Sequence, residues 1–97
     1  MKALNTVKIT FPSRSVNEGF ARSALSAFAA QADPTLDELA DVKTAVSEAV
    51  TNCIVHAYAN TIGPITLTAA LYEDGTLRVA VADKGCGIPD VSKAMEP

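Results

Sequence analysis

Apolar and polar residues alternate in three short segments of the chain, as they do in half-buried β-strands. The first segment covers residues 3–11, and Pro12 is expected to end it. The second and third segments cover residues 65–71 and 77–82. The residues between them, Glu73-Asp74-Gly75-Thr76, are typical of a hairpin turn. The pattern therefore predicts one strand near the N-terminus and a hairpin of two strands later in the chain.

Between the first two predicted strands, apolar residues recur at the three- and four-residue spacing of two helices. The first helix is predicted to begin with a capping box between Ser15 and Glu18. A second capping box, between Thr35 and Glu38, begins a longer helix that is expected to fade at residues 58–60. Two helices on one face of a mostly antiparallel sheet make an α+β two-layer sandwich, which is the predicted fold class.

Composition and charge restrict the classes of function. The chain has a formal net charge of −3 and no cluster of Lys or Arg, so we expect neither direct nucleic-acid binding nor a polybasic membrane contact. Its apolar runs are far shorter than the roughly 20 residues that span a bilayer, and we see no signal peptide. The length fits a single domain over residues 1–97. Cys53 and Cys86 are expected to be free thiols in a reducing cytoplasm.

The longer helix carries three polar residues at a spacing of four, namely Glu48, Asn52 and His56. They stack on one side of the helix, opposite its apolar stripe and among small or apolar neighbours, which suggests that something covers them. Glu48 has three interpretations: a solvated side chain, an ion pair with Lys43 or Lys84, or a general base. The carboxamide of Asn52 suits Mg²⁺. For His56 we expect a hydrogen bond, because no Cys/His cluster supports zinc.

A glycine-rich loop, Asp83-Lys84-Gly85-Cys86-Gly87, directly follows the last predicted strand. Its glycines let the backbone approach a ligand closely, and Asp83 could accept a hydrogen bond from an exocyclic amine. Taken alone, the loop is equally compatible with an ordinary surface turn. It is neither a Walker loop nor a Rossmann fingerprint.

Together, Glu48-x-x-x-Asn52-x-x-x-His56 and Asp83-x-Gly85-x-Gly87 resemble the N box and first glycine box of the GHKL ATPase/kinase superfamily. Within it, the chain is most similar to the bacterial anti-sigma factor serine kinases, and more to the sporulation members than to the stress-response members. A sensor histidine kinase fits less well, since no phosphoacceptor helix is present. The stretches that carry the resemblance are Asn17–Arg22, Ala27–Asp41, Ser47–Tyr58 and Gly87–Asp90.

The resemblance implies an ATP site between the long helix and the glycine loop. Glu48 would be the base or water-orienting group of phosphoryl transfer, and Asn52 would hold Mg²⁺ against the phosphates of ATP or ADP. Asp83 would accept a hydrogen bond from the adenine amino group. The other residues that the resemblance places around the base are Gly85, Gly87 and Ile88.

The resemblance also implies protein partners. In this family the phosphate acceptor is a serine of an anti-anti-sigma protein, and the nucleotide-bound form holds a sigma factor. Arg22 matches the family's partner-contact position, although an ordinary surface arginine describes it equally well. By analogy with the family we expect a homodimer.

The chain departs from the family pattern in two respects. Ala57 stands where the sporulation members often carry glycine, which should leave the mechanism unchanged. Family members also continue through an ATP lid, a second glycine box and further strands, whereas this sequence ends at Pro97. We therefore expect a partial domain, and the sequence is compatible both with nucleotide binding and with its loss. The alternative to a kinase is a partner-binding fragment of the same fold without catalysis.

Overall fold

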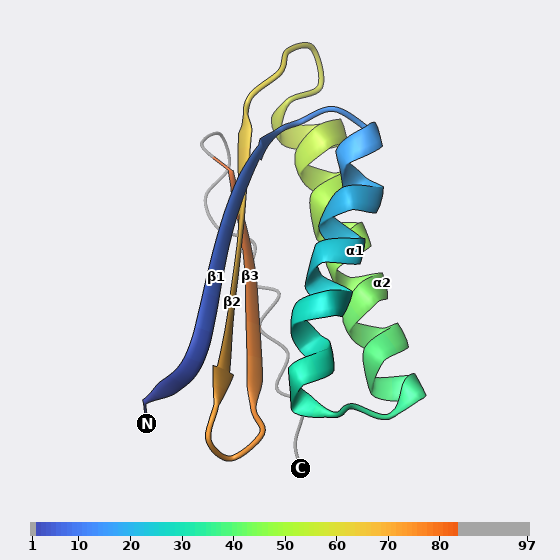
Figure 1. Cartoon of the computed structure of the whole chain (residues 1–97). Coiled ribbons are helices and arrows are strands. Elements are labelled where there is room, and N and C mark those ends of the chain that lie inside the picture. The colour runs from blue at the N-terminus through green and yellow to red at the C-terminus, as the bar shows by residue number, and fades with distance from the viewer. Residues whose placement is uncertain (1, 84–97) are drawn as a thin grey trace.

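The structure is a computed structural model that describes residues 2–83 (Figure 1). Two helices pack on one face of a three-stranded antiparallel sheet, so the predicted α+β two-layer arrangement is confirmed. In chain order the elements are β1 (Ala3–Pro12), α1 (Val16–Ala29), the 3₁₀ turn η1 (Ala30–Ala32), α2 (Leu36–Asn52), the π-helical turn η2 (Cys53–Ala57), β2 (Pro64–Tyr72) and β3 (Leu77–Asp83).

The strands lie in the order β1-β2-β3, and both neighbouring pairs are antiparallel. The predicted hairpin turn at residues 73–76 joins β2 to β3. Gly75 in this turn has a φ of 87°, a conformation that glycine adopts without steric cost. At the other end of the pair, Ile65 of β2 faces Asp83 of β3. This register places Asp83 beside the beginning of β2.

The core lies between the helices and the sheet face that they cover. Alternate residues of β2 and β3 point into it, and one stripe of α2 packs against them. Burying one large aliphatic side chain stabilises the fold by about 1.5–3 kcal/mol. The largest fully buried side chains are Leu25, Ile65, Leu67, Leu77, Val42, Val46, Val50, Val81 and Cys53.

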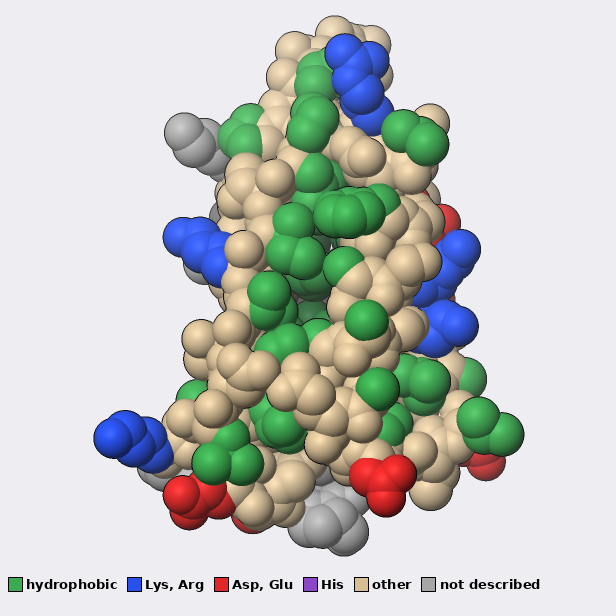
Figure 2. Space-filling view, in the orientation of Figure 1, with side chains coloured by type: hydrophobic (Ala, Val, Ile, Leu, Met, Phe, Trp, Pro, Cys, Tyr) green, Lys and Arg blue, Asp and Glu red, His purple; other side chains and the backbone are tan. Residues whose placement is uncertain are grey.

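One side of the sandwich leaves apolar side chains exposed. Figure 2 shows hydrophobic side chains gathered on the face where β1 and α1 lie nearest the viewer. Phe11 of β1 is buried, whereas Phe20 of α1 is 52% exposed. Their rings meet edge to face with centroids 6.2 Å apart. Because β1 is also an edge strand, its outer backbone groups have no strand partner within residues 2–83.

The two predicted capping boxes have opposite outcomes. At α2, the Thr35 hydroxyl accepts the Glu38 N–H at 3.1 Å and the Glu38 carboxylate accepts the Thr35 N–H at 2.8 Å, which confirms that box. At α1 the prediction is wrong. Ser15 makes no side-chain capping bond, because its backbone is helical (φ −59°, ψ −31°) and not in the extended conformation of a cap. The Glu18 carboxylate is instead bound by other side chains of α1 and α2.

The long helix ends near Tyr58 as predicted, but its last turn is π-helical. The backbone N–H of Tyr58 donates to the carbonyl of Cys53 at 3.0 Å, which closes a turn over five residues. The Tyr58 hydroxyl donates to the carbonyl of Pro64, the first residue of β2, at 2.8 Å. Gly63 passes so close to the Tyr58 ring that an added Cβ would overlap it. These contacts tie the end of the helix to the beginning of β2.

Candidate functional site

Glu48 and Asn52 lie one turn apart on α2, and His56 lies in η2; all three side chains are exposed. Among residues 2–83, neither Glu48 nor Asn52 has a side-chain hydrogen bond or ion pair. The ion pair of Glu48 with Lys43 therefore does not form, and Lys84 lies outside the described residues. Because η2 closes its hydrogen bonds over five residues, His56 does not continue the α-helical row of the other two.

Two shallow depressions, of about 460 and 390 Å³, adjoin on the outer side of α2. Both are lined by Ser47 and Glu48, so we describe them together as the α2 groove. Arg22 of α1 lines one end of the groove, and Asn52 lines the other. The remaining residues of the groove are Ala40, Lys43, Thr44 and Thr51. The structure thus brings the predicted partner-contact, catalytic and metal-binding residues to one surface.

A depression of about 420 Å³ lies away from this groove and is lined by residues of all three strands. Lys8 of β1 and Arg78 of β3 contribute its positive charges. None of the predicted site residues lines it. It therefore serves as a comparison surface for ligand binding to the α2 groove.

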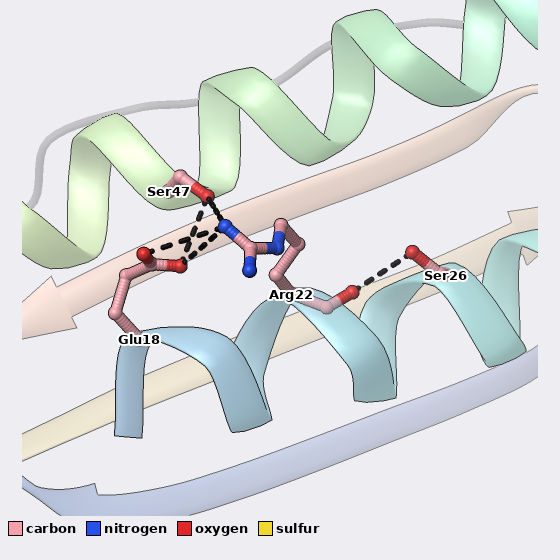
Figure 3. Close-up of polar contacts among 4 residues, drawn as sticks. All are labelled: Glu18, Arg22, Ser26 and Ser47. Atoms are coloured by element: carbon pink, nitrogen blue, oxygen red, sulfur yellow. Dashed lines mark hydrogen bonds and ion pairs between the residues drawn. The ribbon is translucent and has the colours of Figure 1, made fainter. Parts of the chain in front are cut away.

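Arg22 is held at the end of the groove by a cluster of three side chains (Figure 3). Its Nη1 donates to Glu18 Oε2 at 3.0 Å and to Ser47 Oγ at 3.3 Å, and the Ser47 hydroxyl donates to the same Glu18 oxygen at 3.1 Å. The cluster joins α1 to α2. Since the Arg22 side chain is 42% exposed, the ion pair contributes little to stability, but it fixes where the guanidinium lies.

Asp83 is brought to the end of α2 by the sheet. As the last residue of β3 it pairs with Ile65, and its Oδ2 accepts a hydrogen bond from the thiol of Cys53 at 3.4 Å. Cys53 is 1% exposed and directly follows Asn52 in the chain. The strand end and the helix end that the sequence assigned to one site therefore meet in the fold.

Three predicted site residues, Gly85, Gly87 and Ile88, lie outside the described residues. Among residues 2–83, no group of three or more His, Cys, Asp or Glu side chains is placed to hold a metal ion. Such a cluster is not what the predicted Mg²⁺ needs, because this ion keeps several waters and takes few protein ligands. The exposed carboxamide of Asn52, without a hydrogen-bond partner among residues 2–83, fits that role.

Two residues of the site were missed by the sequence-based reasoning. Ser47 connects Arg22 and Glu18 to the helix that carries Glu48, and it directly precedes Glu48. Cys53 contacts Asp83 and directly follows Asn52. Both residues are chain neighbours of the Glu48/Asn52 motif, which was the only signal in the sequence. Their partners are seen only once α1 and β3 pack against α2.

Comparison with known proteins identifies the family of the domain. Residues 11–97 match the histidine kinase-like ATPase domain. The anti-sigma F factor of Caldanaerobacter subterraneus subsp. tengcongensis is 56% identical over 97 residues, which cover all of this chain and 67% of that protein.

Two further relatives show the same similarity. The anti-sigma F factor of Clostridium beijerinckii is 53% identical, over 96% of this chain and 65% of its own length. The anti-sigma F factor of Geobacillus kaustophilus is 48% identical, over 96% of this chain and 64% of its own length. The chain thus spans about two thirds of the length of these relatives.

Within residues 2–83, no helix has the length and apolar character needed to cross a membrane. The resemblance to the GHKL superfamily that was noted from Glu48, Asn52 and Asp83 is confirmed by the match over residues 11–97. On this match and on the identity to the anti-sigma F factors, the chain belongs to the family of histidine kinase-like ATPase domains.

Proposed function

We propose that this protein is an anti-sigma factor that binds ATP or ADP and transfers phosphate from ATP to a serine of an anti-anti-sigma protein. The single observation that carries the proposal is the α2 groove, in which Arg22, Glu48 and Asn52 share one surface. The name anti-sigma F factor, common to the relatives, supports a sigma factor as one partner. We propose that this activity takes place in the cytoplasm and serves sporulation. We also propose that residues 1–97 form one partial domain.

The proposed nucleotide site lies at the Asn52 end of the α2 groove. Asp83 would accept the adenine amino group, and Gly85, Gly87 and Ile88 would surround the base. Asn52 would hold Mg²⁺, which when bound neutralises charge on the phosphate oxygens. The contact between Cys53 and Asp83 supports this arrangement, because it joins the chain neighbour of Asn52 to the proposed adenine acceptor.

Glu48 is proposed as the base of phosphoryl transfer. The acceptor hydroxyl gives its proton to the Glu48 carboxylate while its oxygen bonds to the γ-phosphorus, and the bond from phosphorus to ADP breaks. A base of this kind must be reachable by the acceptor hydroxyl and must not be occupied by an ion pair. Glu48 is exposed and has no cation paired with it among residues 2–83, which fits that requirement.

Arg22 is proposed to contact the protein partner. Glu18 and Ser47 hold its guanidinium at the rim of the same groove that Glu48 lines, so a bound partner would lie next to the base. We also propose a homodimer. Within residues 2–83 the outer edge of β1 has no strand partner, and Phe20 lies exposed beside it, which supports self-association.

Calorimetric titration with Mg·ATP tests nucleotide binding. We expect measurable heat and a rise in melting temperature, because a ligand that binds only the folded state stabilises it. If neither appears, the second candidate remains, namely a partner-binding fragment without catalysis. In that candidate Arg22, which Glu18 and Ser47 hold at the α2 groove, still contacts the partner.

Transfer of labelled phosphate from ATP to an anti-anti-sigma protein tests the kinase. Replacing the base in Glu48→Gln should slow transfer by about 100-fold or more, because general base catalysis contributes on that scale. Glu73→Gln is the matched control, since Glu73 is exposed in the hairpin turn away from the groove. Equal labelling by the wild type and Glu48→Gln would exclude Glu48 as the base.

A further inference from the structure

The contact between Cys53 and Asp83 joins a buried thiol to the carboxylate at the end of β3. The Cys53 side chain is 1% exposed, and its Sγ lies 3.4 Å from Asp83 Oδ2. A thiol is a weak hydrogen-bond donor, but a carboxylate acceptor strengthens such a bond. One oxygen of the Asp83 carboxylate is therefore attached to the core.

The fold holds both partners of this contact in place. Cys53 is the first residue of η2, and its carbonyl accepts the Tyr58 N–H at 3.0 Å. Tyr58 in turn donates through its hydroxyl to Pro64 at 2.8 Å, and the next residue, Ile65, pairs with Asp83. The thiol and the carboxylate are thus linked twice, directly by their hydrogen bond and indirectly through the helix end, β2 and β3.

We propose that Cys53 is a positioning residue that orients the Asp83 carboxylate for recognition of the adenine amino group. The inference rests on the proposed function, and it assigns base selectivity to a residue of the core. Cys53 itself touches no nucleotide in this proposal. It acts by fixing the plane of the carboxylate that does.

A purely structural role for Cys53 makes a different prediction. If the thiol only fills space, truncating Cys53 to alanine would weaken the binding of every ligand of the site alike, through loss of packing. A thiol that orients Asp83 would affect only ligands that use the carboxylate. ITP separates the two roles, because it carries a carbonyl where ATP carries the amino group and gives Asp83 no amine to bind.

The test is calorimetric titration of wild type, Cys53→Ala and Cys53→Ser with Mg·ATP and Mg·ITP. Cys53→Ala should weaken ATP binding by about threefold to tenfold and ITP binding by less than about twofold. Cys53→Ser keeps a donor and should retain the preference for ATP to within about twofold. Val50→Ala is the matched control, since this buried neighbour on α2 should lower the melting temperature without changing the ratio of the two affinities.

An equal loss of ATP and ITP binding in Cys53→Ala would overturn the proposal and leave the packing role. A wild type that binds neither nucleotide would instead refute the proposed function. In that case the contact between Cys53 and Asp83 can still be tested without nucleotide, from the ¹³C resonance of the Asp83 carboxyl carbon. That resonance should move in Cys53→Ala and stay in place in Val50→Ala; an unchanged resonance in Cys53→Ala would also overturn the proposal.

Discussion

At its N-terminal end α2 begins with a capping box between residues three apart, whereas its C-terminal end passes into a π-helical turn held by contacts with β2 and β3. The first end is closed by its own sequence, through Thr35 and Glu38. The second depends on Tyr58, Pro64 and Asp83, which come together only in the fold. The proposed nucleotide residues lie at the second end. Neighbouring residues in the sequence therefore account for the first end of α2, whereas tertiary contacts shape the end at which we propose the nucleotide site.

The largest expected change in stability comes from adding a methyl group at the C-terminal end of α2. Gly63→Ala places a methyl group in the Tyr58 ring and should lower the free energy of unfolding by about 1–3 kcal/mol, because the ring would have to move and its hydroxyl would lose the hydrogen bond to Pro64. Hydrogen exchange at the Tyr58 amide should become faster. Gly19→Ala is the control: its added methyl group has 4.0 Å to the nearest atom of Arg22, and it should be neutral or stabilising.

The first end of α2 should respond to loss of its cap. Thr35→Ala removes the acceptor of the Glu38 N–H and should lower the free energy of unfolding by about 1 kcal/mol, measured by urea denaturation. Ser15→Ala at the start of α1 is the matched comparison, and it should change stability by less than about 0.5 kcal/mol because Ser15 makes no capping bond. Similar losses in both variants would contradict the difference between the two helix starts.

The smallest effect is expected in the cluster that joins α1 to α2. Ser47→Ala removes one acceptor of Arg22 and one donor to Glu18, on a surface where ion pairs contribute little. The free energy of unfolding should fall by about 0.5 kcal/mol or less, while binding of an anti-anti-sigma partner weakens more clearly. A loss of stability above about 2 kcal/mol would mean that the cluster is structural and not a means of holding Arg22 for a partner.

Several features of the fold could be predicted from the sequence, because they depend on neighbours in the chain. The alternation in the strands, the turn at Gly75 and the cap at Thr35 are set by residues within a few positions. The capping box at Ser15 fails because the Ser15 backbone is helical and Glu18 is occupied by other side chains. Glu18, which the sequence pairs with Ser15, is bound by Arg22 and by Ser47 of the other helix.

The residues of the candidate site could be proposed from the sequence, but their arrangement could not. The spacing of Glu48 and Asn52 on one helix follows from its period, and the groove that they line confirms that they share a surface. The sequence-based prediction did not include the π turn or the hydrogen bond by which the Tyr58 hydroxyl reaches Pro64 across a loop. Likewise, the contact of Cys53 with Asp83 follows only from the packing of β3 against the helix end.

A titration of the protein with Mg·ATP, followed by two-dimensional NMR, tests most directly whether nucleotide binds at the end of α2. A nucleotide at the end of α2 should concentrate the chemical-shift changes at Glu48 and Asn52 in the groove and at Asp83 at the end of β3. The depression on the open face of the sheet, with Lys8 and Arg78, is the internal comparison. Shifts confined to Lys8 and Arg78, with Asn52 and Asp83 unmoved, would contradict a nucleotide site at the end of α2.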